Sequence, residues 1–282
     1  MKFPLDKGHF ITGGDGAGWY RRKPVHASEY IKAVYQSQAI MGDVGFYSNI
    51  IENHDEPRGV SHYLPEGECL VEGKKMLALL SFMVRGLPFI YEGQEIGMEN
   101  KTFTSIEEVD DCSTMHEYQA ALEAGLTPGQ AIEAVGRYCR DNARTPMQWD
   151  DSDNAGFTAG KPWLAVNPNY KQINVKAQQA DEDSVLAFYK KLIALRKSQE
   201  YKETVVYGEL IPVPQADENV MVFYRKSAEK TLLVAANYQA AETDVKIADQ
   251  VKKEVLNNKK ELQIKEGVLH LSGYQAVVLE VV

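Results

Sequence analysis

The stretch that decides the fold runs Asn49-Ile50-Ile51-Glu52-Asn53-His54-Asp55-Glu56-Pro57-Arg58. Ile50 and Ile51 are β-branched and predict a buried strand. Pro57 has no N–H and restricts Glu56 to an extended conformation, so the chain must leave the sheet there. The stretch therefore predicts a strand that ends in a short polar turn.

Three polar residues, Asn53, His54 and Asp55, stand where this strand runs out. An imidazole and a carboxylate at the C-terminal end of a parallel strand are what α/β barrels use to build active sites. The plainer alternative, a polar turn with no chemical role, is common after strands. The ten residues alone leave both interpretations open.

Length and composition restrict the class of protein. The chain has 282 residues, of which 44% are hydrophobic and 25% charged, as in a globular protein of one large domain or two. Its formal charge of −9 argues against binding to nucleic acid or to an anionic membrane, which needs a positive surface. No apolar run approaches the length of a transmembrane helix.

The N-terminus and the cysteines favour a cytoplasmic protein. Residues 1–6 lack the apolar core of a signal peptide. Cys69, Cys112 and Cys139 are odd in number and far apart, which fits reduced thiols better than disulfides or a metal site. The glycine-rich run 13–16 lacks the lysine of a P-loop and is predicted to be a flexible loop. We expect no metal and no cofactor.

The first hundred residues have the pattern of a βαβ unit. Apolar spacing predicts a helix over 26–41, with Ser28 as its N-cap, before the first strand. A second helix over 72–85, apolar on one side, is predicted to end at Gly86 and to lead into a short buried strand at 87–91. Strand, helix and strand in this order imply a parallel pair with a right-handed crossover.

The middle of the chain is predicted to carry an insertion. Ser105 and Thr127-Pro128 mark helix starts in a helical region over about 100–139. Residues 140–180 are polar and show no periodicity, and so long a loop in a compact domain is often functional. A strong helix is predicted to follow over 183–197.

Beyond residue 203 the apolar residues recur with a period of two, which is typical of strands. Strands are predicted near 205–207, 220–224, 232–236, 245–247 and 277–282. The sequence therefore predicts two domains, an α/β domain over 1–203 and an antiparallel β-sandwich over 204–282.

Three sets of polar residues are expected to meet in one cleft. They are Asn53, His54 and Asp55 after the first strand, Glu92, Gln94 and Glu95 after the next, and Arg140 and Arg144 from the long loop. A carboxylate accepts hydrogen bonds from sugar hydroxyls, and imidazole and guanidinium groups donate them. Trp149, Phe157 and Trp163 would cover the apolar face of a sugar ring. The alternative keeps the arginines as salt bridges and the aromatic rings as packing within the loop.

Three motifs closely resemble the α-amylase family of glycoside hydrolases, and within it the oligo-1,6-glucosidase, dextran glucosidase and α-glucosidase group. They are Glu52-Asn53-His54-Asp55-Glu56-Pro57-Arg58, Phe89-Ile90-Tyr91-Glu92-Gly93-Gln94-Glu95-Ile96-Gly97-Met98 and Arg140-Asp141-Asn142-Ala143-Arg144-Thr145-Pro146-Met147-Gln148-Trp149. The resemblance covers residues 45–282 and implies the C-terminal part of a (β/α)8 TIM barrel followed by an all-β antiparallel C-terminal domain.

The resemblance also implies roles for single residues. Asp55 matches the family's third catalytic carboxylate, a transition-state stabiliser that holds the 2- and 3-hydroxyls of the sugar. His54 and Arg140 match substrate-binding residues, and Asn53 completes the family's Asn-His-Asp signature. Arg144 is expected to be structural and to tie the loop down.

The resemblance further implies that two catalytic residues are missing. The family's aspartate nucleophile and glutamate acid/base precede the Asn-His-Asp motif by a long stretch, yet only 52 residues precede Asn53 here and none forms the Arg-x-Asp nucleophile pattern. We therefore expect a fragment of a retaining α-glucosidase, inactive alone, whose substrate is an oligosaccharide with a terminal α-linked glucose. The missing N-terminal half, or a second copy, is expected to cover the open barrel edge.

Two alternatives to an α-glucosidase fragment remain at this stage. One is a non-catalytic carbohydrate-binding fragment, and the other is an inactive truncated chain. A geometric prediction accompanies the favoured hypothesis: the Arg140 guanidinium should lie within twice the ~4 Å limit of an ion pair from the Asp55 carboxylate.

Overall fold

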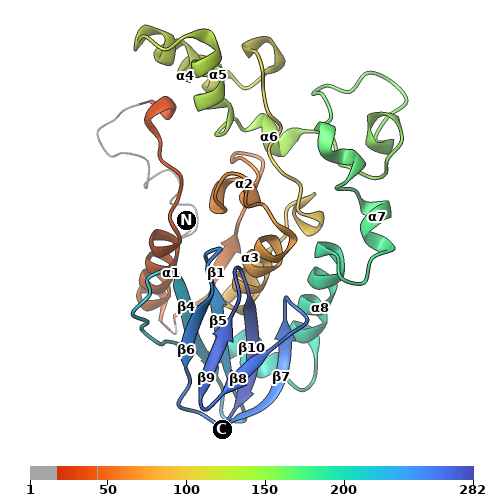
Figure 1. The fold of residues 1–282 in the computed structure, drawn as a ribbon. Helices are drawn as coiled ribbons and strands as arrows, with labels where there is room; N and C mark the ends of the chain where they lie inside the picture. The colour runs from red at the N-terminus through yellow and green to blue at the C-terminus, as the bar shows by residue number, and fades with distance from the viewer. Residues whose placement is uncertain (1–17, 43) are drawn as a thin grey trace.

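A computed structural model of the chain describes residues 18–42 and 44–282 (Figure 1). The α-helices are α1 (Ala27–Met41), α2 (Gly59–Tyr63), α3 (Val71–Met83), α4 (Cys112–Glu123), α5 (Pro128–Gly136), α6 (Asp141–Arg144), α7 (Val175–Gln179) and α8 (Val185–Lys197). The strands are β1 (Tyr47–Ile50), β2 (Gly86–Phe89), β3 (Glu209–Pro212), β4 (Val220–Lys226), β5 (Thr231–Asn237), β6 (Thr243–Lys246), β7 (Val251–Asn257), β8 (Gln263–Lys265), β9 (Val268–Leu271) and β10 (Ala276–Val281). Short 3₁₀ helices lie at Trp19–Arg21, Gln94–Ile96, Ile106–Glu108, Asp153–Gly156 and Pro168–Lys171, and a π-helix lies at Glu203–Tyr207.

The predicted βαβ unit is confirmed. Strands β1 and β2 pair in parallel, with Tyr47 opposite Gly86 and Ile50 opposite Phe89, and α3 connects them. Strand β1 ends at Ile50, before the predicted end at Asn53. The polar motif therefore lies in the turn that leaves the sheet.

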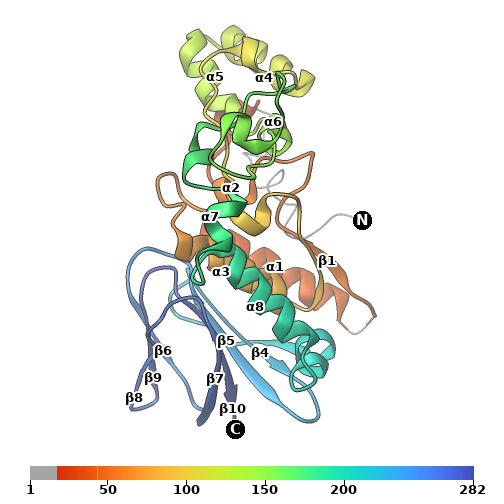
Figure 2. The ribbon, with the colours of Figure 1, turned by 90° about the vertical axis from the view of Figure 1, so that its right-hand side faces the viewer.

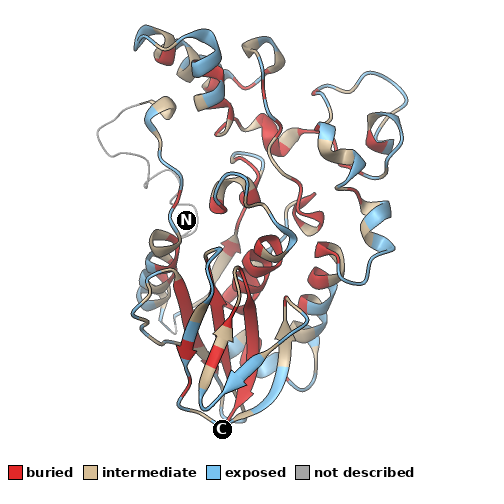
Figure 3. Cartoon of the chain, in the orientation of Figure 1, coloured by how far each residue is buried: buried red, intermediate tan, exposed pale blue. Residues whose placement is uncertain are grey.

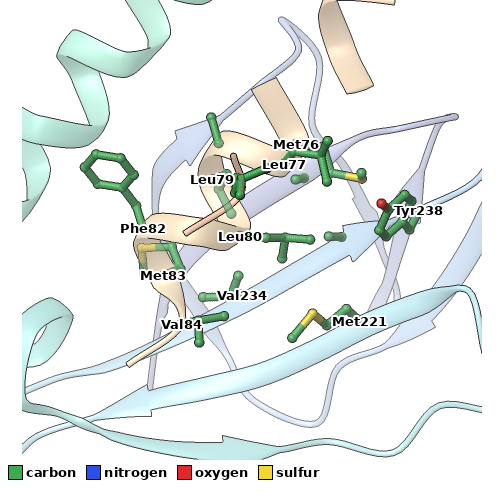
Figure 4. Close-up of a cluster of buried hydrophobic side chains, with 14 of the residues drawn as sticks. Met76, Leu77, Leu79, Leu80, Phe82, Met83, Val84, Met221, Val234 and Tyr238 are labelled. Carbon is green, nitrogen blue, oxygen red and sulfur yellow. The ribbon is translucent and has the colours of Figure 1, made fainter. Parts of the chain in front are cut away.

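Helix α3 is the centre of the molecule. The predicted apolar side of this helix is buried, and so is every other residue from Gly73 to Met83. The helix is enclosed because the β-sandwich packs against it on one side and α8 and β2 pack against others. Met76 and Leu80 lie in one cluster with Met221 of β4, as Figure 4 shows. The α/β part and the sandwich thus share one hydrophobic core.

The C-terminal part is an antiparallel β-sandwich. Its sheets have the strand orders β3-β4-β5-β10-β7 and β6-β9-β8. Along β4, Met221 and Phe223 face the core around α3, whereas Val220 and Val222 face the smaller sheet. Both faces of the large sheet are therefore covered, and Figure 3 shows β4, β5 and β10 buried over most of their length. The all-β antiparallel domain is confirmed, although the sequence analysis did not predict strands β3, β7, β8 and β9.

The strand predicted at 205–207 is wrong, because Glu203–Tyr207 forms a π-helix. Val205 donates its N–H to Tyr201 O at 2.8 Å, which continues a helical turn. That turn directs the carbonyls of Val206 and Gly208 to the buried guanidinium of Arg225. Tertiary packing here overrides the strand preference of two valines. Strand β3 begins at Glu209, and the division at 203 and 204 stays a prediction.

The helix caps were predicted unevenly. Thr127 and Ser184 cap α5 and α8 with their side chains, as expected. Ser28 does not cap α1, because the helix begins at Ala27 and His26 forms a capping box with Glu29. Gly86 is not the end of α3, which stops at Met83; it is the first residue of β2. The glycine run 13–16 lies outside the described residues.

The insertion predicted over about 100–139 contains α4 and α5, which lie far from the sandwich (Figure 2). The 140–180 segment is less irregular than predicted, since it holds α6, α7 and two 3₁₀ helices. None of the described helices is long and apolar enough to cross a bilayer. The three cysteines are free thiols, of which Cys112 is exposed and Cys139 buried.

Candidate functional site

The turn after β1 presents two side chains to solvent. Asn53 Oδ1 accepts the N–H of Asp55 at 2.7 Å, and Asn53 O accepts the N–H of Glu56 at 3.3 Å. This Asx turn fixes the backbone and leaves the side chains of His54 and Asp55 70% and 57% exposed. His54 Nε2 lies 3.4 Å from Asp55 Oδ2. Asn53 therefore shapes the motif through the backbone.

A buried ion pair closes the base of the turn. Arg58 Nη1 lies 3.2 Å from Glu52 Oε1, and both side chains are almost fully buried. Glu52 Oε2 also accepts the N–H of Gly59 at 2.5 Å. Burial raises the pKa of Glu52, against the opposing effect of Arg58. Because the pair joins the residues on either side of the turn, it fixes the base of the turn that carries His54 and Asp55.

Arg58 also ties three segments of the chain together. It donates from Nη1 to Glu92 O at 2.6 Å and from Nε to Asn142 O at 3.2 Å. Its own N–H is accepted by Asn100 Oδ1 at 2.9 Å. The turn after β1, the loop after β2 and the start of the long loop therefore meet around one guanidinium.

Two arginines of the long loop reach Asp55. Arg140 Nη1 lies 3.6 Å and Arg144 Nη2 3.3 Å from Asp55 Oδ1. The predicted closeness of Arg140 to Asp55 is confirmed. Arg144 ties the loop down as expected, because its Nε donates to His54 O at 3.0 Å. It also faces the Asp55 carboxylate directly, as expected from the predicted meeting of Arg144 and Asp55 in one cleft.

Behind the arginines stand two buried aspartates that sequence reasoning missed. Asp111 Oδ1 accepts from Arg140 Nε at 2.9 Å and also from Nη2, and its side chain has no exposed surface. Burial opposes ionisation of Asp111, but the hydrogen bonds from Arg140 and Thr114 outweigh it and lower its pKa. Asp141 Oδ1 lies 3.6 Å from Arg144 Nη1. In the sequence, the only indication of a role for Asp111 is its place just before a helical run, where a carboxylate often caps the helix.

The residues after β2 do not all join this cleft. Gln94 is buried and donates from Nε2 to the hydroxyl of Tyr189 on α8 at 2.9 Å, so the prediction that places it beside Asp55 is wrong. The physical reason is the 3₁₀ turn Gln94–Ile96, which turns the amide into the core. Within residues 18–42 and 44–282, the side chains of Glu92 and Glu95 form no hydrogen bond or ion pair with His54, Asp55 or Arg140.

The aromatic residues of the long loop are open to solvent. Trp149 and Phe157 are each 50% exposed and Trp163 is 66% exposed. Trp163 Nε1 donates to Asp110 Oδ2 at 2.8 Å, next to the residue that holds Arg140. The three rings are therefore not buried packing of the loop. Among residues 18–42 and 44–282, no three carboxylate, imidazole or thiol groups gather as metal ligands would.

Comparison with known families agrees with this geometry. Residues 1–208 match the family model described as alpha amylase, catalytic domain, and residues 220–278 match the alpha-amylase SusG C-terminal domain. The chain belongs to the α-amylase family. The two matched regions correspond to the α/β part and to the β-sandwich.

Relatives of this α-amylase family chain are longer proteins. It is 40% identical to the oligo-1,6-glucosidase of Parageobacillus thermoglucosidasius over 242 residues, which cover 86% of this chain and 42% of that protein. It is 36% identical to the glucan 1,6-alpha-glucosidase of Streptococcus pneumoniae over 85% of this chain and 44% of the relative. The chain thus spans less than half the length of the curated relatives it matches.

A solved structure places the chain within the family fold. The trehalose-6-phosphate hydrolase of Bacillus licheniformis superposes with a TM-score of 0.88 at 32% identity, over 97% of this chain and 50% of that one. The match is to the C-terminal half of a (β/α)8 enzyme with its all-β domain. The pair β1 and β2 therefore corresponds to strands of the (β/α)8 barrel of these enzymes, and the polar turn lies at the C-terminal end of such a strand.

Proposed function

We propose that this chain is the glucose-binding half of a retaining α-glucosidase that acts on oligosaccharides with a terminal α-linked glucose. The observation that carries the proposal is the position of Asp55, an exposed carboxylate faced by Arg140, Arg144 and His54 at the end of a barrel strand. Named relatives that act on 1,6-linked glucosides, at up to 40% identity, support it. The three free thiols support a reducing compartment such as the cytoplasm.

The geometry suits recognition of a neutral polyol. Asp55 accepts from two neighbouring hydroxyls, while Arg140 and His54 donate to others. Such contacts strengthen as the sugar ring flattens towards the oxocarbenium-like transition state. We therefore assign Asp55 the role of transition-state stabiliser, His54 and Arg140 the role of substrate-binding residues, and Asn53 the shaping of the turn that carries them.

Hydrolysis with retention needs a nucleophile and an acid/base in addition to Asp55. Asp111 and Asp141, the two further carboxylates that contact the arginines, are buried behind them. We propose that the other barrel strands supply both groups, so the chain alone binds sugar without turning it over.

Exposed apolar side chains on and just after β2 suggest that another chain covers this side of the barrel. Leu87 and Phe89 of β2 are 50% and 51% exposed, and Ile90 beyond the strand is 39% exposed. Bulky apolar side chains on barrel strands normally fill the barrel interior. We propose that the complementary half of the barrel covers them. A second copy would bring, within the described residues, one more pair of parallel strands, and an eight-stranded barrel closes only with its full set.

Hydrolysis of p-nitrophenyl α-glucoside tests the catalytic part of this proposal. The purified chain should show no turnover above background, whereas the intact oligo-1,6-glucosidase of P. thermoglucosidasius serves as the positive control. Turnover by the chain alone, lost in Asp55→Ala, would place the catalytic pair within this sequence and contradict the proposal. If the chain shows no turnover and also binds no sugar, the result would favour a chain without a ligand function.

A further inference from the structure

The Arg140 guanidinium is fixed along one edge only. Its Nε and Nη2 donate to Asp111 Oδ1, and Nη2 also donates to Ser113 Oγ at 3.0 Å. The hydrogen bonds that Arg140 donates to the Asp111 carboxylate raise the pKa of Arg140. The Nε and Nη2 side of the guanidinium is therefore hydrogen-bonded to the segment that starts α4.

The opposite edge of the guanidinium faces the sugar site. Nη1 lies 3.6 Å from Asp55 Oδ1, beyond hydrogen-bonding distance but within that of an ion pair. The Nη1 hydrogens have no hydrogen-bond acceptor among the described residues that would compete with a sugar hydroxyl. Nη1 is thus the part of Arg140 that meets the substrate, and its place depends on what holds the other edge.

Asp111 is itself held from several sides. Its Oδ2 accepts from Thr114 Oγ1 at 2.7 Å and its Oδ1 from Ser113 N at 3.2 Å, which makes it the N-cap of α4. Its own N–H donates to Asp141 Oδ2 at 2.9 Å. A carboxylate with these contacts and no exposed surface has little freedom to follow a moving arginine.

We propose that Asp111 is a positioning residue for glucose recognition. It holds the Nε and Nη2 edge of Arg140 so that Nη1 stands beside Asp55 before the sugar arrives. The helical insertion thereby contributes to a site whose carboxylate and imidazole, Asp55 and His54, follow a barrel strand. This inference rests on the proposed sugar-binding function of Asp55 and Arg140.

Asp111→Asn separates positioning from folding. Asparagine caps helices about as well as aspartate and keeps one oxygen for the capping bond from Ser113 N. It removes the second oxygen, which accepts from Thr114, and the charge that orients the guanidinium. Thr127→Ala is the matched control, because Thr127 caps α5 of the same insertion and does not touch Arg140. This control loosens the insertion and should leave Arg140 in place.

Two measurements on the whole chain test the proposal. In ¹⁵N-arginine-labelled protein, the Nε–H signal of Arg140 is assigned by its loss in Arg140→Gln, and its exchange with water is then measured without any sugar. Asp111→Asn should speed this exchange at least about tenfold, as expected for loss of a charge-assisted hydrogen bond. Titration with methyl α-D-glucoside should show an affinity about tenfold lower, and no further loss when Asp111→Asn is added to Arg140→Gln.

Several results would overturn the assignment. They are an unchanged Nε–H exchange rate in Asp111→Asn, equal effects of Thr127→Ala, or a loss of affinity from Asp111→Asn that persists in the Arg140→Gln background. Failure of the proposed function looks different. In that case the unaltered chain binds no methyl α-D-glucoside, or Asp55→Ala binds it equally well, and the exchange rate still decides whether Asp111 positions Arg140.

Discussion

Arg144 Nη2 lies 3.3 Å from Asp55 Oδ1, although 89 positions separate the two residues in the sequence. Arg140, which precedes α6, approaches the same oxygen at 3.6 Å. Residues four apart lie on one face of a helix, so the two arginines leave α6 on the side of Asp55. A single helical turn thus brings two cations to one carboxylate.

Replacement of Arg140 by lysine should weaken sugar binding about tenfold, because one ammonium group cannot bond Asp111 and also face Asp55 as a forked guanidinium does. The measurement is a titration with methyl α-D-glucoside. Arg137→Lys is the control, since Arg137 forms an exposed ion pair with Glu66. Full affinity in Arg140→Lys would show that charge alone is sufficient.

Replacement of Arg225 by methionine should lower the stability of the packing between the α/β part and the β-sandwich. The buried guanidinium donates to Met83 O at 2.6 Å and to Gly208 O at 2.9 Å, at the ends of α3 and the π-helix. Burial lowers its pKa to about 9. Loss of these donors should cost about 2–4 kcal/mol of unfolding free energy. Urea denaturation measures it, with the exposed neighbour Lys226→Met as control; equal stabilities would refute the role.

Acid should destabilise the sandwich through Glu280. Hydrogen bonding from Lys252, helped by Lys230 and Tyr201, lowers the pKa of Glu280 from 4.5 to about 2, against the effect of burial. A lowered folded-state pKa stabilises the protein above pH 4.5 and loses this contribution as the pH falls towards 2. The free energy of unfolding should fall by about 2 kcal/mol. This is less than the full pKa shift would imply, because Lys252 is solvent-exposed and water screens its charge.

Thermal unfolding between pH 6 and pH 2.5 measures this effect. In Glu280→Gln the melting temperature should fall less steeply with acidification than in the unaltered chain. The exposed Glu218→Gln should keep the original slope. Identical slopes in all three proteins would mean that other carboxylates govern acid stability.

The sequence was most informative where structure is local. The turn at Asn53–Asp55, the caps at Thr127 and Ser184 and the βαβ unit all follow from neighbouring residues and short periods. The burial of α3 on all sides did not follow, because it depends on a sandwich formed by residues more than a hundred positions further on.

The site was only partly predictable for the same reason. Asp55, His54 and Arg140 belong to short motifs, and the structure brings them together. Asp111 carries no motif, and its importance arises only when folding places it against Arg140. Gln94 sits within a motif, yet a 3₁₀ turn directs it to Tyr189. Side-chain direction in a short turn is set by tertiary contacts that sequence spacing does not encode.

The most direct test of the central claim is the affinity of the whole chain for methyl α-D-glucoside, compared with that of Asp55→Asn. Asp150→Asn is the control, a carboxylate of the long loop that accepts from Ser152. The account predicts measurable binding in the unaltered chain and in the control, and at least about a tenfold loss in Asp55→Asn, as for removal of a charged hydrogen-bond acceptor. Equal affinity in Asp55→Asn and the unaltered chain would contradict it.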